Sequence, residues 1–199
     1  MNIEERKQKA MDIKEQLQEY AVDVAQRIVA SDFDALAAIV QRIIQAKTDG
    51  KTVYTAGNGG SATTASHLCN DLLKGCRVNG REGIKAVCLA DSNAIVTCLA
   101  NDFSYDDIFA VQLKTLATQG DVFVTFSGSG HSPNIISALE TAREIGVTTI
   151  GFSGRDGGKM KGLCDLLLIA PTDSMEQIED MHLLYEHAMI CAIREKLKI

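Results

Sequence analysis

The sequence lacks the features that mark membrane-inserted, exported and disulfide-stabilised proteins. No apolar run approaches about 18 residues, so we expect no membrane-spanning segment. The charged first residues, 1–7, have no apolar core of the kind that a signal peptide needs. The 6 cysteines include no C-x-x-C pair, and most lie in apolar segments, where a free thiol acts as a small hydrophobic group. We therefore expect a reduced, cytoplasmic protein.

The sequence also has no excess of positive charge. Lys and Arg number 20 against 26 Asp and Glu, which gives a formal net charge of −6. We therefore expect no broad binding surface for nucleic acid or an anionic membrane, and any attraction for an anion must be local. With 199 residues, 46% of them hydrophobic, the chain is long enough to bury a substantial core. We expect one domain over 1–199.

The glycines do not form a nucleotide-binding motif. The P-loop pattern G-x-x-x-x-G-K-[ST] is absent, and the stretch 128–133 has proline where the third glycine of G-x-G-x-x-G would stand. Glycine and serine gather instead in two turns, 57–61 and 127–132. Each turn follows an apolar, β-branched segment and leads into a helical pattern. Serine-rich turns of this kind suit a single phosphate or sugar hydroxyls.

Both turns have the composition of an anion-binding loop. Glycine permits the tight strand-to-helix turn, and the helix start offers free N–H groups and a partial positive charge. Hydroxyl donors add to these at four positions, Ser61, Ser127, Ser129 and Ser132. The alternative is an ordinary turn with Ser132 as N-cap and Pro133 at the first helical position. Two such turns favour a phosphorylated small molecule held from two sides.

The remaining pattern predicts an α/β fold. The first fifty residues read as helices, with Ser31 or Asp32 as an N-cap between two of them, and their apolar face needs a partner, most simply another copy of the chain. Strands are expected at 52–56, 84–90, 121–127, 147–152 and 166–170. Helices are expected at about 61–74, 92–101, 106–118, 133–145 and 174–197. This alternation predicts a three-layer sandwich: a five-stranded, mostly parallel sheet flanked by helices, with both turns at the carboxyl ends of strands.

Histidines and carboxylates gather in two of the predicted helices. His67 and Asp71 are four residues apart and share a helix face, where they can bind a metal, act as an acid/base couple or form a surface contact. The last helix carries Glu179, His182, Glu186 and His187. Glu179 and His187 are eight residues apart, about 12 Å along a straight helix. A single metal ion can bind both Glu179 and His187 only if their side chains are fully extended, the helix is broken, or a second subunit contributes. His182 can equally pair with Glu179 or Glu186.

The segment around Asn101 and Asp102 follows an apolar helix end. Asn101 is a natural helix C-cap there, and Asp106 a natural N-cap for the next helix. A capping role and a ligand-facing role for Asp102 are compatible.

Taken together, these residues resemble the sugar isomerase (SIS) domain family, and within it the phosphoheptose isomerases. The resemblance covers essentially the whole chain, with 1–50 as a helical oligomerisation arm and 51–199 as the phosphosugar-binding core. The segments that carry it are 57–62 with His67, 100–102, 127–134, 154–159, and 179–182 with His187. It implies a flavodoxin-like fold and conversion of sedoheptulose 7-phosphate to D-glycero-D-manno-heptose 7-phosphate, a heptose precursor for lipopolysaccharide or capsule.

The resemblance also implies roles for individual residues. Substrate-binding positions are Asn58, Gly59, Gly60, Ser61, Asn101, Asp102, Ser127, Gly128, Ser129, Ser132 and Glu179. Positions for zinc are His67, Asp71, Glu179 and His187, with Asp71 as catalytic base and His187 as catalytic acid. A homotetramer with active sites at subunit contacts is implied as well.

The chain departs from the family pattern at three positions. Relatives typically have Glu where this chain has Asp71, Gln where it has Glu179, and Asn where it has His131. The metal set still contains two imidazoles and two carboxylates, which suit a divalent ion. Two alternatives stay open. One is a non-catalytic SIS-domain protein that binds a phosphosugar or the replication initiator DnaA, and the other is an isomerase of another phosphosugar.

Overall fold

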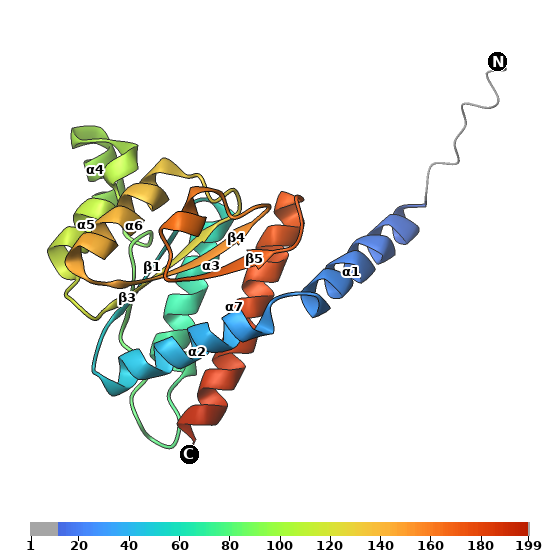
Figure 1. Cartoon of the computed structure of the whole chain (residues 1–199), viewed down its shortest axis with the longest axis horizontal. Helices are drawn as coiled ribbons and strands as arrows, with labels where there is room; N and C mark the ends of the chain where they lie inside the picture. Colours follow the sequence, from blue (N-terminus) through green and yellow to red (C-terminus); the bar gives the residue numbers. More distant parts are fainter. Residues whose placement is uncertain (1–11, 199) are drawn as a thin grey trace.

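The computed structural model describes residues 12–198 (Figure 1). Its strands are β1 (Val53–Gly57), β2 (Ala86–Cys88), β3 (Val122–Ser127), β4 (Thr148–Gly154) and β5 (Leu166–Ala170). Its α-helices are α1 (Ile13–Val29), α2 (Phe33–Thr48), α3 (Gly60–Asn70), α4 (Asn93–Asp102), α5 (Ala110–Leu116), α6 (Pro133–Ile145) and α7 (Met175–Leu197). Short helical turns are η2 (Asp71–Gly75), η3 (Tyr105–Asp107) and η4 (Gly158–Gly162).

The strands form one parallel sheet in the order β2-β1-β3-β4-β5. At its centre Thr55 of β1 is in register with Val124 of β3, and Val124 with Ile150 of β4. The chain winds outward from β1 to β2, then returns to place β3 on the other side of β1. The sheet therefore reverses its winding between β1 and β3, the position where ligands bind in open α/β sheets. Both glycine–serine turns follow these two strands, and the predicted parallel sheet is confirmed.

Alternation along the strands separates two cores. Val122, Val124 and Phe126 of β3 face one side, where they pack with α2, α3 and α7. Phe123 points to the other side and packs with α4, α5 and α6. Helices therefore cover both faces of the sheet, as Figure 1 shows, and the three-layer expectation is confirmed.

Helix α1 extends away from the sheet (Figure 1). None of its residues is buried, and Leu17 is 68% exposed. Its contact with the body includes a hydrogen bond from the Tyr20 hydroxyl to Asp180, 2.5 Å long, and partial burial of Val24 and Ile28. Residues 1–11 of the predicted arm lie outside the described part of the chain. The apolar stripe predicted for α1 is thus largely unpartnered within one copy.

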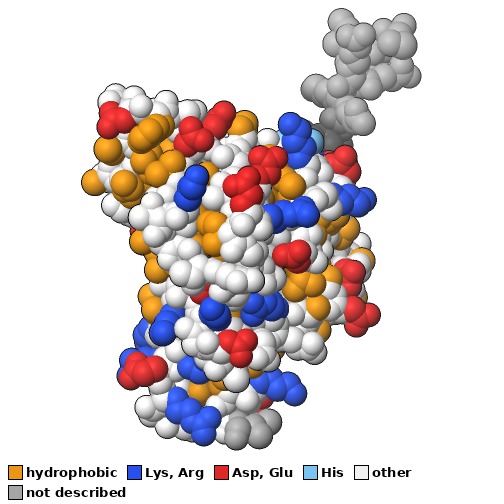
Figure 2. Space-filling model, turned by 60° about the vertical axis from the view of Figure 1, so that its left-hand side comes forward, with side chains coloured by type: hydrophobic (Ala, Val, Ile, Leu, Met, Phe, Trp, Pro, Cys, Tyr) orange, Lys and Arg blue, Asp and Glu red, His pale blue; other side chains and the backbone are white. Residues whose placement is uncertain are grey.

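Helix α2 begins directly after Asp32, one of the two residues predicted as its N-cap. The Asp32 side chain accepts a hydrogen bond of 2.9 Å from the Ala35 N–H, so Asp32, not Ser31, is the N-cap. Within residues 12–198, no helix has the length and apolarity to cross a membrane. On the face drawn in Figure 2, side chains of both charges are interspersed.

Three predicted elements differ in detail. The helix expected over 61–74 ends as a π-helical turn, η2, in which the Cys76 N–H bonds to the Asp71 carbonyl. The helix expected over 106–118 is divided into η3, capped by Ser104, and α5. α5 ends early because Asp121 accepts hydrogen bonds from the Thr118 N–H and hydroxyl. The strand expected over 84–90 shortens to β2, an edge strand that pairs with β1 alone.

Candidate functional site

The two glycine–serine turns lie side by side and are bonded to each other. Asn58, after β1, and Asn134, in the first turn of α6, exchange two side-chain amide hydrogen bonds of 2.9 and 2.8 Å. The Tyr105 hydroxyl donates a third, of 3.0 Å, to the Asn58 side-chain oxygen. These bonds fix the distance between the turns before any ligand arrives.

A pocket of about 130 Å³ opens between the turns. Its lining residues are Asn58, Ser61, Phe126, Ser127, Gly128, Ser129, Ser132, Met175 and Glu179. Ser132 stands at the N-cap of α6 and Pro133 at its first position, as the ordinary-turn alternative predicts. The Ser132 hydroxyl, however, caps no N–H and lies 3.2 Å from the Ser127 hydroxyl. It is therefore available to a ligand.

Two glycines let α7 approach the turns closely. A Cβ atom at Gly60 would collide with the Glu179 carboxylate, and one at Gly128 would lie 2.5 Å from the Met175 sulfur. These approaches place Met175 and Glu179 as the third wall of the pocket. Gly59, with φ +56°, occupies a conformation that favours glycine; it is exposed and is not among the residues that line the pocket.

Asn101 and Asp102 are not among the residues that line this pocket. Both are exposed at the end of α4, where the Asn101 side chain donates to the Asp102 carboxylate at 2.8 Å. The capping expectations for this segment are wrong, because Phe103 follows α4 as its C-cap and Ser104, not Asp106, caps the next turn. The predicted substrate-binding role of Asn101 and Asp102 stays a prediction.

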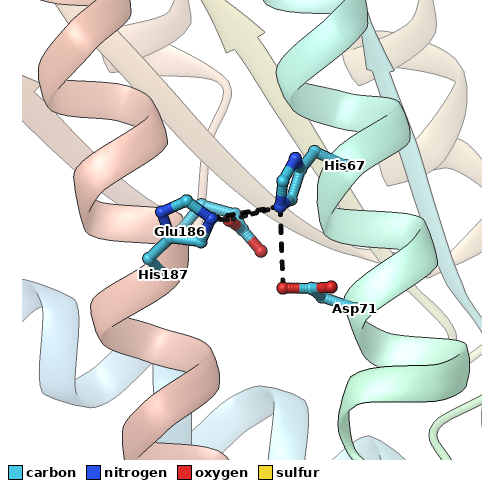
Figure 3. A group of neighbouring side chains, drawn as sticks. All are labelled: His67, Asp71, Glu186 and His187. Atoms are coloured by element: carbon cyan, nitrogen blue, oxygen red, sulfur yellow. Dashed lines mark hydrogen bonds and ion pairs between the residues drawn. The ribbon is translucent and has the colours of Figure 1, made fainter.

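A cluster of histidines and carboxylates lies between α3 and α7 (Figure 3). His67 of α3, Asp71 of η2, and Glu186 and His187 of α7 each offer one ligand atom, and these atoms all lie within 4.8 Å of one another. The two Nε2 atoms of His67 and His187 are 3.1 Å apart, and Asp71 lies 3.7 Å from His67. The π turn at Asp71 is of a kind that often occurs at functional sites. This set of donors could hold a metal ion.

Glu186 is the unusual member of the cluster. Its side chain is fully buried, and neither carboxylate oxygen has a hydrogen-bond donor among the described residues. One oxygen lies 3.5 Å from His187 Nε2 and 3.9 Å from His67 Nε2. Burial and the neighbouring Asp71 raise the pKa of Glu186 to about 8. A buried, unpartnered carboxylate beside two imidazoles fits a divalent cation.

Glu179, the other carboxylate expected at a metal, does not belong to this cluster in one copy of the chain. It lies against Gly60 in the serine pocket, two helical turns before Glu186. From the sequence, Glu186 was expected only as a possible partner of His182. The signal that could have found it is its place in the apolar stripe of α7, between the buried Tyr185 and Met189.

His182 pairs with neither Glu179 nor Glu186. It is buried against the stacked rings of Phe126 and Phe152, and its Nε2 lies 3.2 Å from the Ser153 carbonyl. Burial lowers the pKa of His182 to about 4, so the ring is neutral near pH 7. Its place is structural, beneath the site.

The fold and the site define an α/β protein with a serine-lined pocket beside a histidine–carboxylate cluster. The family model described as "SIS domain" matches residues 16–154, and the chain belongs to this family. Within the family it groups with the phosphoheptose isomerases, as the sequence resemblance predicts.

Three relatives carry that grouping. The phosphoheptose isomerase of Paramagnetospirillum magneticum is 44% identical over 153 residues, which cover 75% of this chain and 79% of the relative. That of Trichlorobacter lovleyi is 35% identical over 185 residues, 93% of each chain. A solved phosphoheptose isomerase structure from Francisella tularensis matches with a TM-score of 0.86 and 26% identity, over 90% of this chain and 95% of that one.

Proposed function

We infer that this protein is an aldose–ketose isomerase that converts sedoheptulose 7-phosphate to D-glycero-D-manno-heptose 7-phosphate through an enediol. One observation carries the inference: the serine pocket and the histidine–carboxylate cluster share helices α3 and α7. Ser61 and His67 are six residues apart on α3, about 9 Å along the helix. An extended seven-carbon sugar can span this distance with its phosphate in the pocket and its carbonyl end at the cluster.

The pocket supplies the binding energy. Ser127, Ser129 and Ser132 donate hydroxyl hydrogen bonds to the phosphate, and the start of α6 supplies N–H groups and the positive end of its dipole. This anchoring is remote from the reacting carbons, so it positions them without taking part in the chemistry. Glu179, which lines the pocket, accepts hydrogen bonds from sugar hydroxyls in this proposal.

The cluster supplies the proton transfers. Asp71 removes the proton from C1 of the ketose and returns it to C2. His187, through the ring nitrogen that does not face His67, protonates the C2 oxygen and accepts the proton from the C1 hydroxyl. His67, His187 and a carboxylate would hold a divalent ion, for which we propose Zn²⁺, and that ion would polarise the carbonyl oxygen. In this proposal His67 and His187 therefore lie at the end of the site where negative charge develops on the carbonyl oxygen of the sugar.

The proposed assembly is a homotetramer with active sites at subunit contacts, located in the cytoplasm. The exposed apolar stripe of α1 supports it, because such a face needs a partner. A second apolar hollow of about 650 Å³ lies between α2 and α7 and includes Leu36, Ile44 and Met189 in its lining. A second chain that brings Asn101 or Asp102 to the pocket would satisfy their predicted role.

The test is incubation of the purified protein with sedoheptulose 7-phosphate, with and without Zn²⁺, followed by detection of the aldose product. We expect conversion by the parent protein and none above background by Asp71→Asn or His187→Gln. Parental turnover by either folded variant would overturn the catalytic assignment. Binding of the sugar phosphate without conversion would instead favour a non-catalytic phosphosugar-binding protein.

A further inference from the structure

Helix α1 is joined to the rest of the chain by polar contacts with one short segment, 171–180. None of the residues of α1 is buried, yet three of its side chains form hydrogen bonds with this segment. The bonds run from the Tyr20 hydroxyl to Asp180 at 2.5 Å, from Arg27 to the Pro171 carbonyl at 2.8 Å, and from Gln177 to Asp23 at 2.7 Å. The segment links β5 to α7 and includes the first turns of α7, which form one wall of the serine pocket.

Gln177 is the buried member of these contacts. It is 8% exposed, and both ends of its side-chain amide are bonded. Its oxygen accepts a hydrogen bond of 2.7 Å from the Thr172 hydroxyl, and its nitrogen donates one of 2.7 Å to the Asp23 carboxylate. Hydrogen bonds from Arg27 and Gln177 lower the pKa of Asp23, so its carboxylate is ionised near pH 7. Asp23, Thr172 and Gln177 form the α1–α7 network, and polar groups bonded in this way hold one another in a single arrangement.

Gln177 and the pocket residues of α7 lie on opposite sides of the helix. With 3.6 residues per turn, positions two residues apart differ by about 200° around a helix. Met175 and Glu179 are each two residues from Gln177 and four from one another, so they share the face that lines the serine pocket. Gln177 is bonded instead to Asp23 of α1. The α1–α7 network therefore fixes the rotation of the first turns of α7 from the side away from the pocket.

The pocket leaves these turns little freedom to move. The Met175 sulfur lies 2.5 Å from the place of a Cβ at Gly128, and a Glu179 oxygen lies 2.4 Å from the place of one at Gly60. Because both side chains are seated against glycines, a rotation of α7 displaces both of them at once. A wall that is held in place before the ligand arrives avoids the cost of ordering it on binding.

We propose that Gln177 is a positioning residue. Through its bonds to Thr172 and Asp23 it holds Met175 and Glu179 at the serine pocket, and it thereby makes the affinity for substrate depend on the position of α1. Gln177 is not among the residues that line the pocket, so it acts through its neighbours. The proposal deepens the proposed function and rests on it for the identity of the substrate, whereas the α1–α7 network can be tested without substrate.

The experiment exchanges the donor and the acceptor of one hydrogen bond. In Gln177→Glu a carboxylate faces the Asp23 carboxylate in place of an amide, so the donor to Asp23 is lost. The double variant Asp23→Asn with Gln177→Glu restores one donor and one acceptor with their places exchanged. Gln26→Glu, the same change at an exposed position of α1, is the control. All proteins are full-length and are compared at pH 8, where carboxylates are ordinarily ionised.

Hydrogen exchange without substrate tests the α1–α7 network by itself. The amides of 178–181 are bonded within α7, beginning with the Ile178 N–H to the Ser174 carbonyl. We expect them to exchange at least about 10-fold faster in Gln177→Glu than in the parent, and to return to within about threefold of the parent in the double variant. The control should exchange like the parent. Parental exchange in Gln177→Glu, or no recovery in the double variant, would overturn the proposal.

Steady-state kinetics with sedoheptulose 7-phosphate test the consequence for the pocket. We expect KM to rise by about 10-fold in Gln177→Glu, with kcat within about threefold of the parent, and most of the change in KM to be reversed in the double variant. Faster exchange combined with a parental KM would show that the α1–α7 network does not hold the pocket, and would contradict the proposal. A parent that converts no heptose phosphate would contradict the proposed function, while the exchange comparison still decides whether Gln177 holds α7.

A second variant covers the case in which Gln177→Glu does not fold. Asp23→Ala removes the acceptor from α1 without placing a charge in α7, and Asp23 is only partly buried. The same faster exchange of 178–181 and the same rise in KM are expected. Parental values for both would overturn the proposal.

Discussion

The serine pocket and the histidine–carboxylate cluster share α3 and α7 but are built on opposite principles. In the pocket, small side chains are already bonded to one another, as Asn58 is to Asn134 and Ser127 to Ser132. In the cluster, titratable groups face each other, and Glu186 has no hydrogen-bond donor within residues 12–198. The pocket is therefore preorganised for a ligand that it holds by hydrogen bonds. The cluster is incomplete until a proton or a cation compensates its charge.

If this contrast is correct, damage to the cluster should affect chemistry far more than binding. The largest effect is expected for Asp71→Asn, which removes the proposed base but keeps the size of the side chain. We expect kcat to fall by about 10²–10⁴-fold with KM for the heptose phosphate changed much less. Steady-state kinetics at saturating Zn²⁺ measure this, with Asp34→Asn, a change at an exposed position of α2, as the control. A parental kcat in folded Asp71→Asn would contradict the assignment.

The second effect is a loss of stability at low pH caused by His182, and it distinguishes this structural histidine from the histidines of the cluster. His182 has a pKa of about 4 when folded and about 6.5 when exposed, so below pH 6.5 the unfolded chain takes up the proton more readily. Stability should therefore fall as pH falls from about 6.5 toward 4. Between pH 7 and pH 5 this one residue should account for about 2 kcal/mol.

The measurement is urea unfolding of the parent and His182→Gln at pH 7 and pH 5, at one protein concentration. The variant is expected to lose about 2 kcal/mol less than the parent over that interval. An identical loss of stability in both proteins would show that burial of His182 does not cause the loss of stability between pH 7 and pH 5. Isomerase activity of the folded variant at pH 7.5 tests whether His182 has any part in the chemistry.

Substitutions in the serine pocket should affect substrate binding more than chemistry, the opposite of substitutions in the cluster. Ser132→Ala removes a hydroxyl that caps no N–H, so the fold should be unaffected while kcat/KM falls by about 10-fold through loss of one hydrogen bond to the phosphate dianion. Ser92→Ala is the matched control, since Ser92 is also an N-cap without a side-chain capping bond but lies outside the pocket. Equal kinetics for the two variants would argue against phosphate binding by Ser132.

The smallest effect is expected for Tyr105, an exposed residue that is hydrogen-bonded to Asn58 of the pocket. Tyr105→Phe removes the hydrogen bond to Asn58 but leaves the ring, and Tyr105 is 54% exposed. We expect KM to rise by about threefold, with kcat unchanged, because a neutral exposed hydrogen bond contributes on the order of 0.5 kcal/mol. A change of kcat larger than that of KM would show that Tyr105 acts on the chemistry rather than on the pocket.

Elements with strong local signals could be predicted from the sequence. Short apolar runs located all five strands of the described sheet, and helical spacing brought His67 and Asp71 onto one face. The π turn at Asp71 and the division of 106–118 depend on particular hydrogen bonds, such as those accepted by Asp121, which periodicity does not report. Helical spacing likewise could not say which glutamate of α7 faces His67, because that depends on how α7 packs against α3.

The central claim is that the serine pocket holds the phosphate and thereby directs the carbonyl end of the sugar to the cluster. A crystal structure of the assembled protein with sedoheptulose 7-phosphate bound to the Asp71→Asn variant tests it most directly. We expect the phosphate within hydrogen-bond distance of Ser127, Ser129 and Ser132, and C1 and C2 beside residue 71 and His187. A phosphate bound outside the pocket, or a carbonyl end that points away from the cluster in every subunit, would contradict it.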